Sequence, residues 1–199
     1  MLDGPLLLGV IMLSGTQFAG ASGPPDVFIR PVILDIEASG FGRGSYPIEI
    51  GVALNSGRSE CFLVKRESDW THWDPSAANL HGISPEMLLR RGRPPREIAQ
   101  RLNQLLAGMT VYTDAWGVDS SWLALLFERA ELPQRFRLDA LVGLLNEEEK
   151  TAWAMSKVFV RDALRLTRHR ASADALILQA AYVRTKGVSP AAPDGHGLP

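Results

Sequence analysis

Several features are scarce in this sequence. The 199 residues include one cysteine, Cys61, so the chain can form no internal disulfide and holds no cysteine cluster for zinc. We expect Cys61 to be a small buried hydrophobe. The 21 basic and 22 acidic residues give a formal net charge of -1, which excludes a polycation that binds nucleic acid through overall charge. Any contact with nucleic acid must therefore come from local basic patches.

Long hydrophobic runs are also scarce. Pro5–Leu13 is the one marked apolar stretch, and it is too short to span a bilayer, so no membrane association is expected. An Ala-Gly-Ala at residues 19–21 resembles a signal-peptidase site, but no Lys or Arg precedes Arg30. We therefore predict that residues 1–30 are a flexible extension of a cytoplasmic protein. Export through a signal peptide in residues 1–21, or a start codon assigned too early, are the alternatives.

The remaining sequence suits one compact α/β domain over residues 31–186, because its 46% hydrophobic content can supply a core of ordinary size. Residues 187–199 are rich in proline and glycine and are predicted to be a disordered tail. Apolar patterns predict strands at Val32–Glu37, Ile48–Leu54, Cys61–Lys65 and Thr110–Thr113, the first three forming an antiparallel meander. Helical spacing predicts helices around Pro85–Arg90, Pro95–Leu106, Ser120–Arg129, Asp139–Leu145 and Ala173–Val183.

Two carboxylates end the first predicted strand. Asp35 and Glu37 are two residues apart, so their side chains point to the same face. Two carboxylates in one poorly solvated site repel each other and raise each other's pKa unless a cation or a hydrogen-bond donor lies between them. Mg²⁺ or Mn²⁺ is the simplest such cation, since both prefer oxygen ligands. The alternative is a pair that merely ends an exposed strand.

Two further acidic segments follow in order. Asp35-Ile-Glu37-Ala-Ser-Gly40 resembles the first motif of the DEDD exonucleases, and Val111–Leu123 resembles the second, with Asp119 in the metal-ligand position. Asp114 competes with Asp119 for that role. A helix N-cap is the structural alternative for Asp119.

The third motif names a subgroup. His169-Arg-Ala-Ser-Ala-Asp174 resembles the H-x4-D of the histidine-bearing, or DEDDh, exonucleases. Positions five apart lie about 140° around a continuous helix, so His169 must sit on the loop before the helix to face Asp174. Ser172 could cap the helix and place it there.

The resemblance implies a DEDDh 3'-5' exonuclease of the ribonuclease T or proofreading-subunit type. The implied fold is ribonuclease H-like, a mixed five-stranded sheet flanked by helices, with the carboxylates meeting at one edge. Asp35, Glu37, Asp119 and Asp174 would hold two divalent cations. His169 would be the general base, as histidine exchanges protons near neutral pH. The implied substrate is a single-stranded RNA or DNA 3' end, the product a nucleoside 5'-monophosphate, and some relatives form homodimers.

Substrate contacts are assigned by the same resemblance. We expect Ala38, Ser39, Phe41, Trp116 and Arg168 to contact the terminal nucleotides or the phosphate backbone. Relatives often carry two threonines where this chain has Ala38 and Ser39, and an aromatic residue where it has Val118. His81 is expected to be structural. Arg161, Arg165 and Arg168 recur at helical spacing, and either contact phosphates or form a solvated face. A second, more remote basic cluster comprises Arg90, Arg91, Arg93, Arg96 and Arg101.

Three other functions fit the sequence less well. A dinucleotide-binding loop at Gly40–Gly44 fails because Ser45 stands at the third glycine position and a strand, not a helix, follows. A transferase or integrase on the same fold is disfavoured by the pair His169 and Asp174. A catalytically weak or inactive nucleic-acid-binding module remains the alternative, although every catalytic position is filled.

Overall fold

The computed structural model describes residues 29–166 and 169–187. The predicted extension over residues 1–30 and the tail over residues 187–199 fall almost wholly outside this part of the chain. Five strands form one sheet: β1 (Ile33–Ala38), β2 (Pro47–Ala53), β3 (Ser59–Leu63), β4 (Thr110–Thr113) and β5 (Arg137–Ala140). Their order across the sheet is β3-β2-β1-β4-β5, with β1 in the middle.

The sheet is mixed. β1, β2 and β3 form the predicted antiparallel meander, whereas β4 runs parallel to both β1 and β5. The pairing of β1 with β4 is confined to one position, Ile33 opposite Tyr112, while β1 and β2 pair along six. The two halves of the sheet therefore meet at a short seam.

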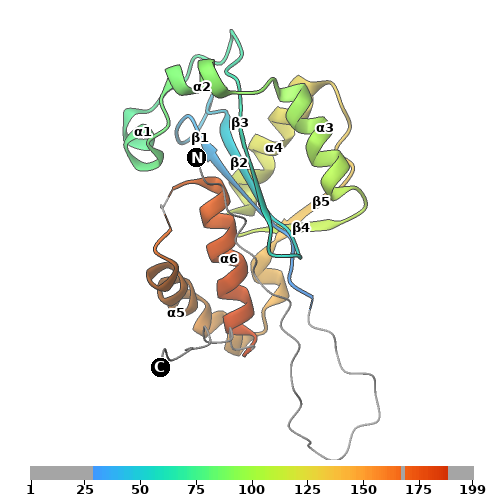
Figure 1. Cartoon of the computed structure of the whole chain (residues 1–199), viewed down its shortest axis with the longest axis vertical. Coiled ribbons are helices and arrows are strands. Elements are labelled where there is room, and N and C mark those ends of the chain that lie inside the picture. The colour runs from blue at the N-terminus through green and yellow to red at the C-terminus, as the bar shows by residue number, and fades with distance from the viewer. Residues whose placement is uncertain (1–28, 167–168, 188–199) are drawn as a thin grey trace, which may run out of the picture.

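Helices cover both faces of the sheet (Figure 1). They are α1 (Pro75–His81), α2 (Pro85–Arg91), α3 (Pro95–Leu106), α4 (Trp116–Ala130), the short 3-10 helix η1 (Leu141–Leu144), α5 (Glu147–Leu164) and α6 (Ala171–Thr185). α6 packs on β1 and β2 and is backed by α5, whereas α3 and α4 pack together on the other face. The predicted α/β class, a mixed five-stranded sheet flanked by helices, is confirmed. None of the described helices is long and apolar enough to cross a membrane.

Alternation along β1 separates two cores. Leu34 and Ile36 belong to the core shared with α3 and α4, and Ile33 belongs to the core under α6. Asp35 and Glu37 have the same parity as Ile33, so they continue the face that α6 covers. The carboxylates thus lie toward the end of the central strand and not on an edge strand.

Three elements differ from the sequence prediction. Asp139 and Ala140 end strand β5, and Leu141–Leu144 form a short 3-10 helix. The helical stretch predicted to start over Asp139–Leu145 is therefore confirmed for Leu141–Leu144 and wrong for Asp139 and Ala140. α5 was not predicted, although Asn146 and Glu149 form a capping box at its start. α1 was also missed, with Asp74 as its N-cap and Gly82 as its left-handed C-cap.

Candidate active site

The site begins at the end of β1. Asp35 and Glu37 are both half-buried there, between β2 on one side and β4 on the other. A short apolar strand places them because its alternate side chains are committed to the two cores, which leaves the carboxylates on the α6 side.

Asp119 reaches the same region from α4. The helix begins at Trp116 with Ala115 as its N-cap, so Asp119 lies in the first turn and the N-cap interpretation is wrong. Asp119 is 2% exposed, and its carboxylate accepts a hydrogen bond from the Thr113 hydroxyl. A carboxylate near a helix N-terminus also gains from the positive end of the helix dipole.

Asp114, the competing acidic residue, is engaged elsewhere. Its carboxylate accepts a hydrogen bond from Trp153 Nε1 at 3.2 Å and forms a 2.6 Å ion pair with Lys157 Nζ. Both partners belong to α5, so Asp114 ties β4 to that helix. Asp119 has no ion pair among the described residues, and it is the more deeply buried of the two.

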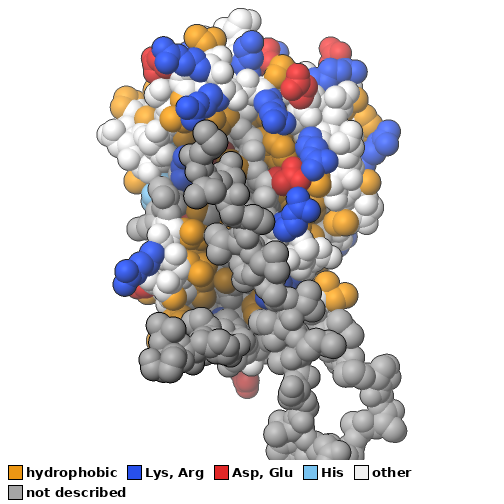
Figure 2. Space-filling view, in the orientation of Figure 1, with side chains coloured by type: hydrophobic (Ala, Val, Ile, Leu, Met, Phe, Trp, Pro, Cys, Tyr) orange, Lys and Arg blue, Asp and Glu red, His pale blue; other side chains and the backbone are white. Residues whose placement is uncertain are grey.

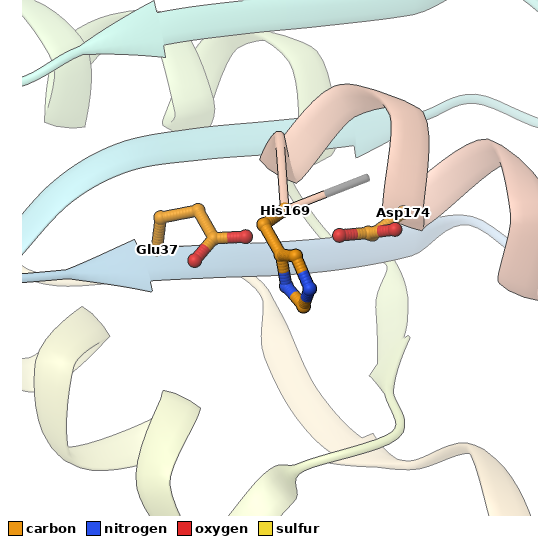
Figure 3. A group of neighbouring side chains, drawn as sticks. All are labelled: Glu37, His169 and Asp174. Carbon is orange, nitrogen blue, oxygen red and sulfur yellow. The ribbon is translucent and has the colours of Figure 1, made fainter. Parts of the chain in front are cut away.

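His169 and Asp174 complete the cluster with Glu37. One ligand atom from each of these residues lies within 4.8 Å of the others, and Figure 3 shows Glu37 on β1, His169 on the loop and Asp174 on the first turn of α6 converging. α6 begins at Ala171 with Arg170 as its N-cap, so His169 precedes the helix as predicted, but Ser172 is not the cap. The backbone of His169 is left-handed, with φ 55°.

The electrostatics of the cluster favour a cation. Burial, followed by the charges of Asp119, Glu37 and Asp174, raises the pKa of Asp35 well above its ordinary value. Burial, and then the charges of Asp174 and Glu49, raises the pKa of Glu37 to about 7. Burial raises the pKa of Asp119 to about 6 despite its hydrogen bond from Thr113. Ionisation of these three carboxylates is therefore unfavourable in the folded protein. Divalent cations that prefer oxygen ligands fit the donor atoms that the carboxylates offer.

Sequence reasoning missed one acidic residue beside this cluster. Glu49 lies directly opposite Glu37 in the β1–β2 register and is fully buried. Arg170 donates two hydrogen bonds from Nε to Glu49 at 3.0 and 3.1 Å, and the amide of Ala171 donates another at 2.8 Å. The signal available in the sequence was an acidic residue within a strand otherwise made of apolar residues and glycine.

Cys61 also differs from its prediction. It is exposed, not buried, and its thiol donates a hydrogen bond to Glu49 Oε1 at 3.2 Å. Although the residue as a whole is exposed, its hydrogen bond to Glu49 is partly buried. Desolvation of the sulfur there, followed by the charge of Glu49, raises the pKa of the thiol to about 11. The side chain is therefore a neutral neighbour of Glu49 at ordinary pH.

The residues predicted to contact substrate lie in different settings. Ala38 and Ser39 are buried, and the Ser39 hydroxyl accepts a hydrogen bond from the Tyr46 amide at 3.1 Å. Phe41 is 65% exposed and Trp116 is 48% exposed, so both rings are available to a ligand. Arg168 lies outside the described residues. These roles remain predictions.

Trp116 borders an open groove of about 760 Å³ between the start of α4 and β5. Its indole N–H donates a 3.1 Å hydrogen bond to the Leu138 carbonyl, which fixes the ring at the groove wall. Among the described residues, Arg135 and Arg137 also line the groove and no acidic side chain does. The groove does not include the carboxylates of the cluster, although Trp116 in its lining precedes Asp119 by three residues on α4.

The structure places the predicted basic residues in different settings. α5 ends at Leu164 and Arg165 is its left-handed C-cap, so the helical face proposed for Arg161, Arg165 and Arg168 does not continue. Arg161 pairs with Asp162. On the face shown in Figure 2, Lys and Arg side chains gather at the end of the molecule where α2 and α3 lie. His81 is buried, and its Nδ1 accepts a hydrogen bond from the Ile83 amide, as expected of a structural residue.

No family model and no curated protein matches the chain, but solved structures of exonuclease I do. The Escherichia coli enzyme in complex with a dT13 oligonucleotide superposes with a TM-score of 0.58 at 17% identity, over 77% of this chain and 40% of that one. Exonuclease I from Methylocaldum szegediense gives 0.55 at 18% identity, over 77% and 40%. A zinc-bound E. coli complex with single-stranded DNA gives 0.54 at 17% identity, over 78% and 40%.

This chain thus spans about 40% of the length of the structures that it matches. At such low identity the likeness concerns the backbone, and the fold is the predicted one. The chain has the ribonuclease H-like fold found in exonuclease I.

Proposed function

We propose that this chain is a divalent-cation-dependent 3'-5' exonuclease that hydrolyses single-stranded nucleic acid and releases nucleoside 5'-monophosphates. The observation that carries the proposal is the cluster of Glu37, His169 and Asp174 at the end of the central strand, together with the charges of Asp119, Glu37 and Asp174 that act on Asp35. A fold alone does not define an activity, so the proposal rests on these side chains.

The four carboxylates would hold two divalent cations, Mg²⁺ or Mn²⁺. The cations supply the positive charge that stabilises the attacking and leaving oxygens of a phosphodiester hydrolysis. The raised pKa values support this assignment, because ionising Asp35, Glu37 and Asp119 together is unfavourable until a cation offsets their repulsion. Asp119 is the better third ligand, since Asp114 is paired with Lys157.

His169 would act as the general base that removes a proton from the attacking water. Its imidazole lies beside the Glu37 and Asp174 carboxylates, on the loop before α6. Phe41 and Trp116 would stack on bases, and Arg135 and Arg137 in the groove would contact phosphates. The exonuclease I structures solved with dT13 and dA16 oligonucleotides support a single-stranded DNA substrate, with RNA as the alternative. The proposed location is the cytoplasm.

The test is a degradation assay with strands labelled at either end. Purified protein is incubated with 3'- or 5'-labelled single-stranded RNA and DNA, in the presence of Mg²⁺, Mn²⁺ or EDTA. We expect the 5'-labelled strand to shorten stepwise and the 3' label to be released at once as a mononucleotide, with no reaction in EDTA. Degradation from the 5' end, or activity that survives EDTA, would contradict the proposal.

Two variants assign the activity to the site. Asp35→Asn should abolish turnover while the circular dichroism spectrum is unchanged, and His169→Ala should lower turnover by about 100-fold or more, the scale of general base catalysis. A protein that binds single strands but shows no cation-dependent turnover would instead be the inactive binding module.

A further inference from the structure

Glu49 is buried beside the candidate site, and its carboxylate is hydrogen-bonded to the loop and helix that follow His169. Its side chain is fully buried in β2, and Arg170 grips it through Nε and Nη2 while Ala171 donates its backbone N–H. Because a buried carboxylate is unfavourable unless it is paired and hydrogen-bonded, these three donors are what allow Glu49 to remain ionised there. Burial acts to raise the pKa of Glu49, but the bonds from Arg170 and Ala171 outweigh it and lower the pKa.

The two residues that hold Glu49 follow His169 directly. His169 has a left-handed backbone, Arg170 is extended at φ -129°, and α6 starts at Ala171. A left-handed non-glycine residue is unfavourable and is kept only where its surroundings fix it. The described structure supplies that constraint on one side of His169, through the bonds from Arg170 and Ala171 to Glu49.

Gly51 fixes the same junction from below. It lies two residues after Glu49 on β2, and hence on the same face of the strand. A Cβ at position 51 would overlap the carbonyl group of Ala171 and the amide nitrogen of Ser172. The start of α6 therefore rests directly on the β2 backbone, with Glu49 bonded to its first amide.

We infer that Glu49 is a positioning residue for His169, acting through Arg170 and the Ala171 amide to hold the imidazole beside Glu37 and Asp174. The inference rests on the proposed function for the role of His169, but the geometry that it claims can be measured without turnover. In the described structure the hydrogen bonds of Glu49 join it to Arg170, Ala171 and Cys61 and not to the imidazole, so its effect passes through the backbone of the loop.

The chain offers a matched control for the Glu49–Arg170 pair. Arg101 on α3 binds Glu60 on β3 through two hydrogen bonds, from Nε at 3.1 Å and from Nη2 at 2.6 Å. This pair has the same two-pronged geometry and also joins a helix to the meander, but neither residue belongs to the candidate site. Glu60→Gln therefore measures the cost of neutralising such a pair where no positioning is involved.

The experiment compares Glu49→Gln, Arg170→Lys and Glu60→Gln with wild type by two measurements. The first is the NMR signal of the His169 ring in cation-free protein, identified by its loss in His169→Gln, with His72 as the internal reference. The second is kcat and KM on a labelled single strand. We expect Glu49→Gln to move and broaden the His169 signal and to lower kcat by about 10- to 100-fold at nearly constant KM, the range typical of groups that orient a site's ligands. Glu60→Gln should change neither.

The outcomes separate the inference from the proposed function. A His169 signal and a kcat within twofold of wild type in Glu49→Gln would overturn the positioning role. Arg170→Lys keeps the positive charge but loses the planar guanidinium that bonds Glu49 through two nitrogens. Because the Arg170 side chain is 36% exposed, this variant tests the positioning role if Glu49→Gln does not fold. If wild type shows no exonuclease activity but the His169 signal still moves in Glu49→Gln, the proposed function fails and the positioning role stands. A loss of kcat in Glu60→Gln equal to that in Glu49→Gln would also overturn the positioning role.

Discussion

Glu37 and Glu49 are direct partners across β1 and β2, yet their pKa values move in opposite directions. Burial and the charges of Asp174 and Glu49 raise the pKa of Glu37 to about 7, whereas hydrogen bonds from Arg170 and the Ala171 amide outweigh burial and lower that of Glu49. The Glu49 carboxylate has its compensating positive charge within the protein, on Arg170. The Glu37 carboxylate has no such hydrogen-bonded partner among the described residues and would be stabilised by a bound cation. This difference underlies the first prediction.

Cation-free protein should lose stability as the pH rises. The pKa of Glu37 is raised from 4.5 to about 7, so its contribution to stability is fully present below pH 4.5 and is lost as the pH rises through about 7. Asp119 has the same sign, from 3.8 to about 6. In this range the folded state binds more protons than the unfolded state, so the free energy of unfolding falls with pH. Thermal unfolding in EDTA should therefore give a lower Tm near pH 8 than near pH 5.

Divalent cations should reverse this trend, because they bind the ionised carboxylates and stabilise the folded state. Glu37→Gln should raise the cation-free Tm at pH 8, and a gain of about 1 kcal/mol corresponds to about 2–4 °C for a chain of this length. The same variant should reduce the Tm gain produced by Mn²⁺. A cation-free Tm that rises between pH 5 and pH 8 would contradict the prediction.

Asp119 and Asp114 should respond differently to amide substitution. Asp119→Asn removes a buried carboxylate of the cluster, so we expect kcat to fall by more than about 100-fold and Mn²⁺ binding to weaken. Asp114→Asn breaks the ion pair with Lys157, which should lower Tm slightly and leave kcat within about tenfold. Steady-state kinetics and calorimetric Mn²⁺ titration distinguish the two. The reverse order would make Asp114 the third carboxylate.

Trp116→Ala should weaken substrate binding more than it slows the chemical step. Stacking of one base on an aromatic ring contributes about 1–3 kcal/mol, which corresponds to roughly 5- to 150-fold in affinity. Fluorescence anisotropy with a labelled single strand and Asp35→Asn protein would measure this loss without turnover. Phe159→Ala is the control, because Phe159 is also exposed but lies on α5, where Arg184 covers its ring. Equal losses in both variants would exclude the groove as the binding surface.

Gly51→Ala should destabilise the fold. The added Cβ overlaps the backbone of Ala171 and Ser172, so either β2 or α6 must shift, and overpacking of this kind costs about 1–3 kcal/mol or more. Gly117→Ala is the matched control, since a Cβ at Gly117 in α4 meets nothing within 4 Å and alanine favours the helix by about 1 kcal/mol. Chemical denaturation should thus give changes of opposite sign. A Gly51→Ala protein as stable as wild type would contradict the close packing of α6.

The sequence was informative where a local pattern determines the structure. β1 and its carboxylates were predictable because a short apolar strand commits alternate residues to two cores. The place of His169 before α6 was predictable from the resemblance to the H-x4-D motif together with the helical angle between positions five apart. α5 was missed although Asn146 and Glu149 form its capping box, and Asp139 was assigned to a helix because its apolar neighbours fit two periods.

The remaining features depend on tertiary contacts. The full burial of Glu49 follows from Arg170, which is 121 positions away, and no local pattern reveals that pairing. The exposure of Cys61 follows in the same way from its place on the edge strand β3.

The short seam between β1 and β4 has a consequence for the spacing of the four carboxylates. Asp35 and Glu37 lie on β1, in the antiparallel ladder with β2. Asp119 is hydrogen-bonded to Thr113 on β4, which pairs in parallel with β5. β1 and β4 connect these two ladders through a single residue pair, Ile33 and Tyr112. Beyond that pair β1 and β4 are not paired in the described part of the chain, so we expect the separation of Asp35 from Asp119 to depend on the packing of α4 more than on hydrogen-bond register. Substitutions in the hydrophobic face of α4 would therefore tune the gap between the two ladders in small steps, whereas a slip of register could change it only by whole residues.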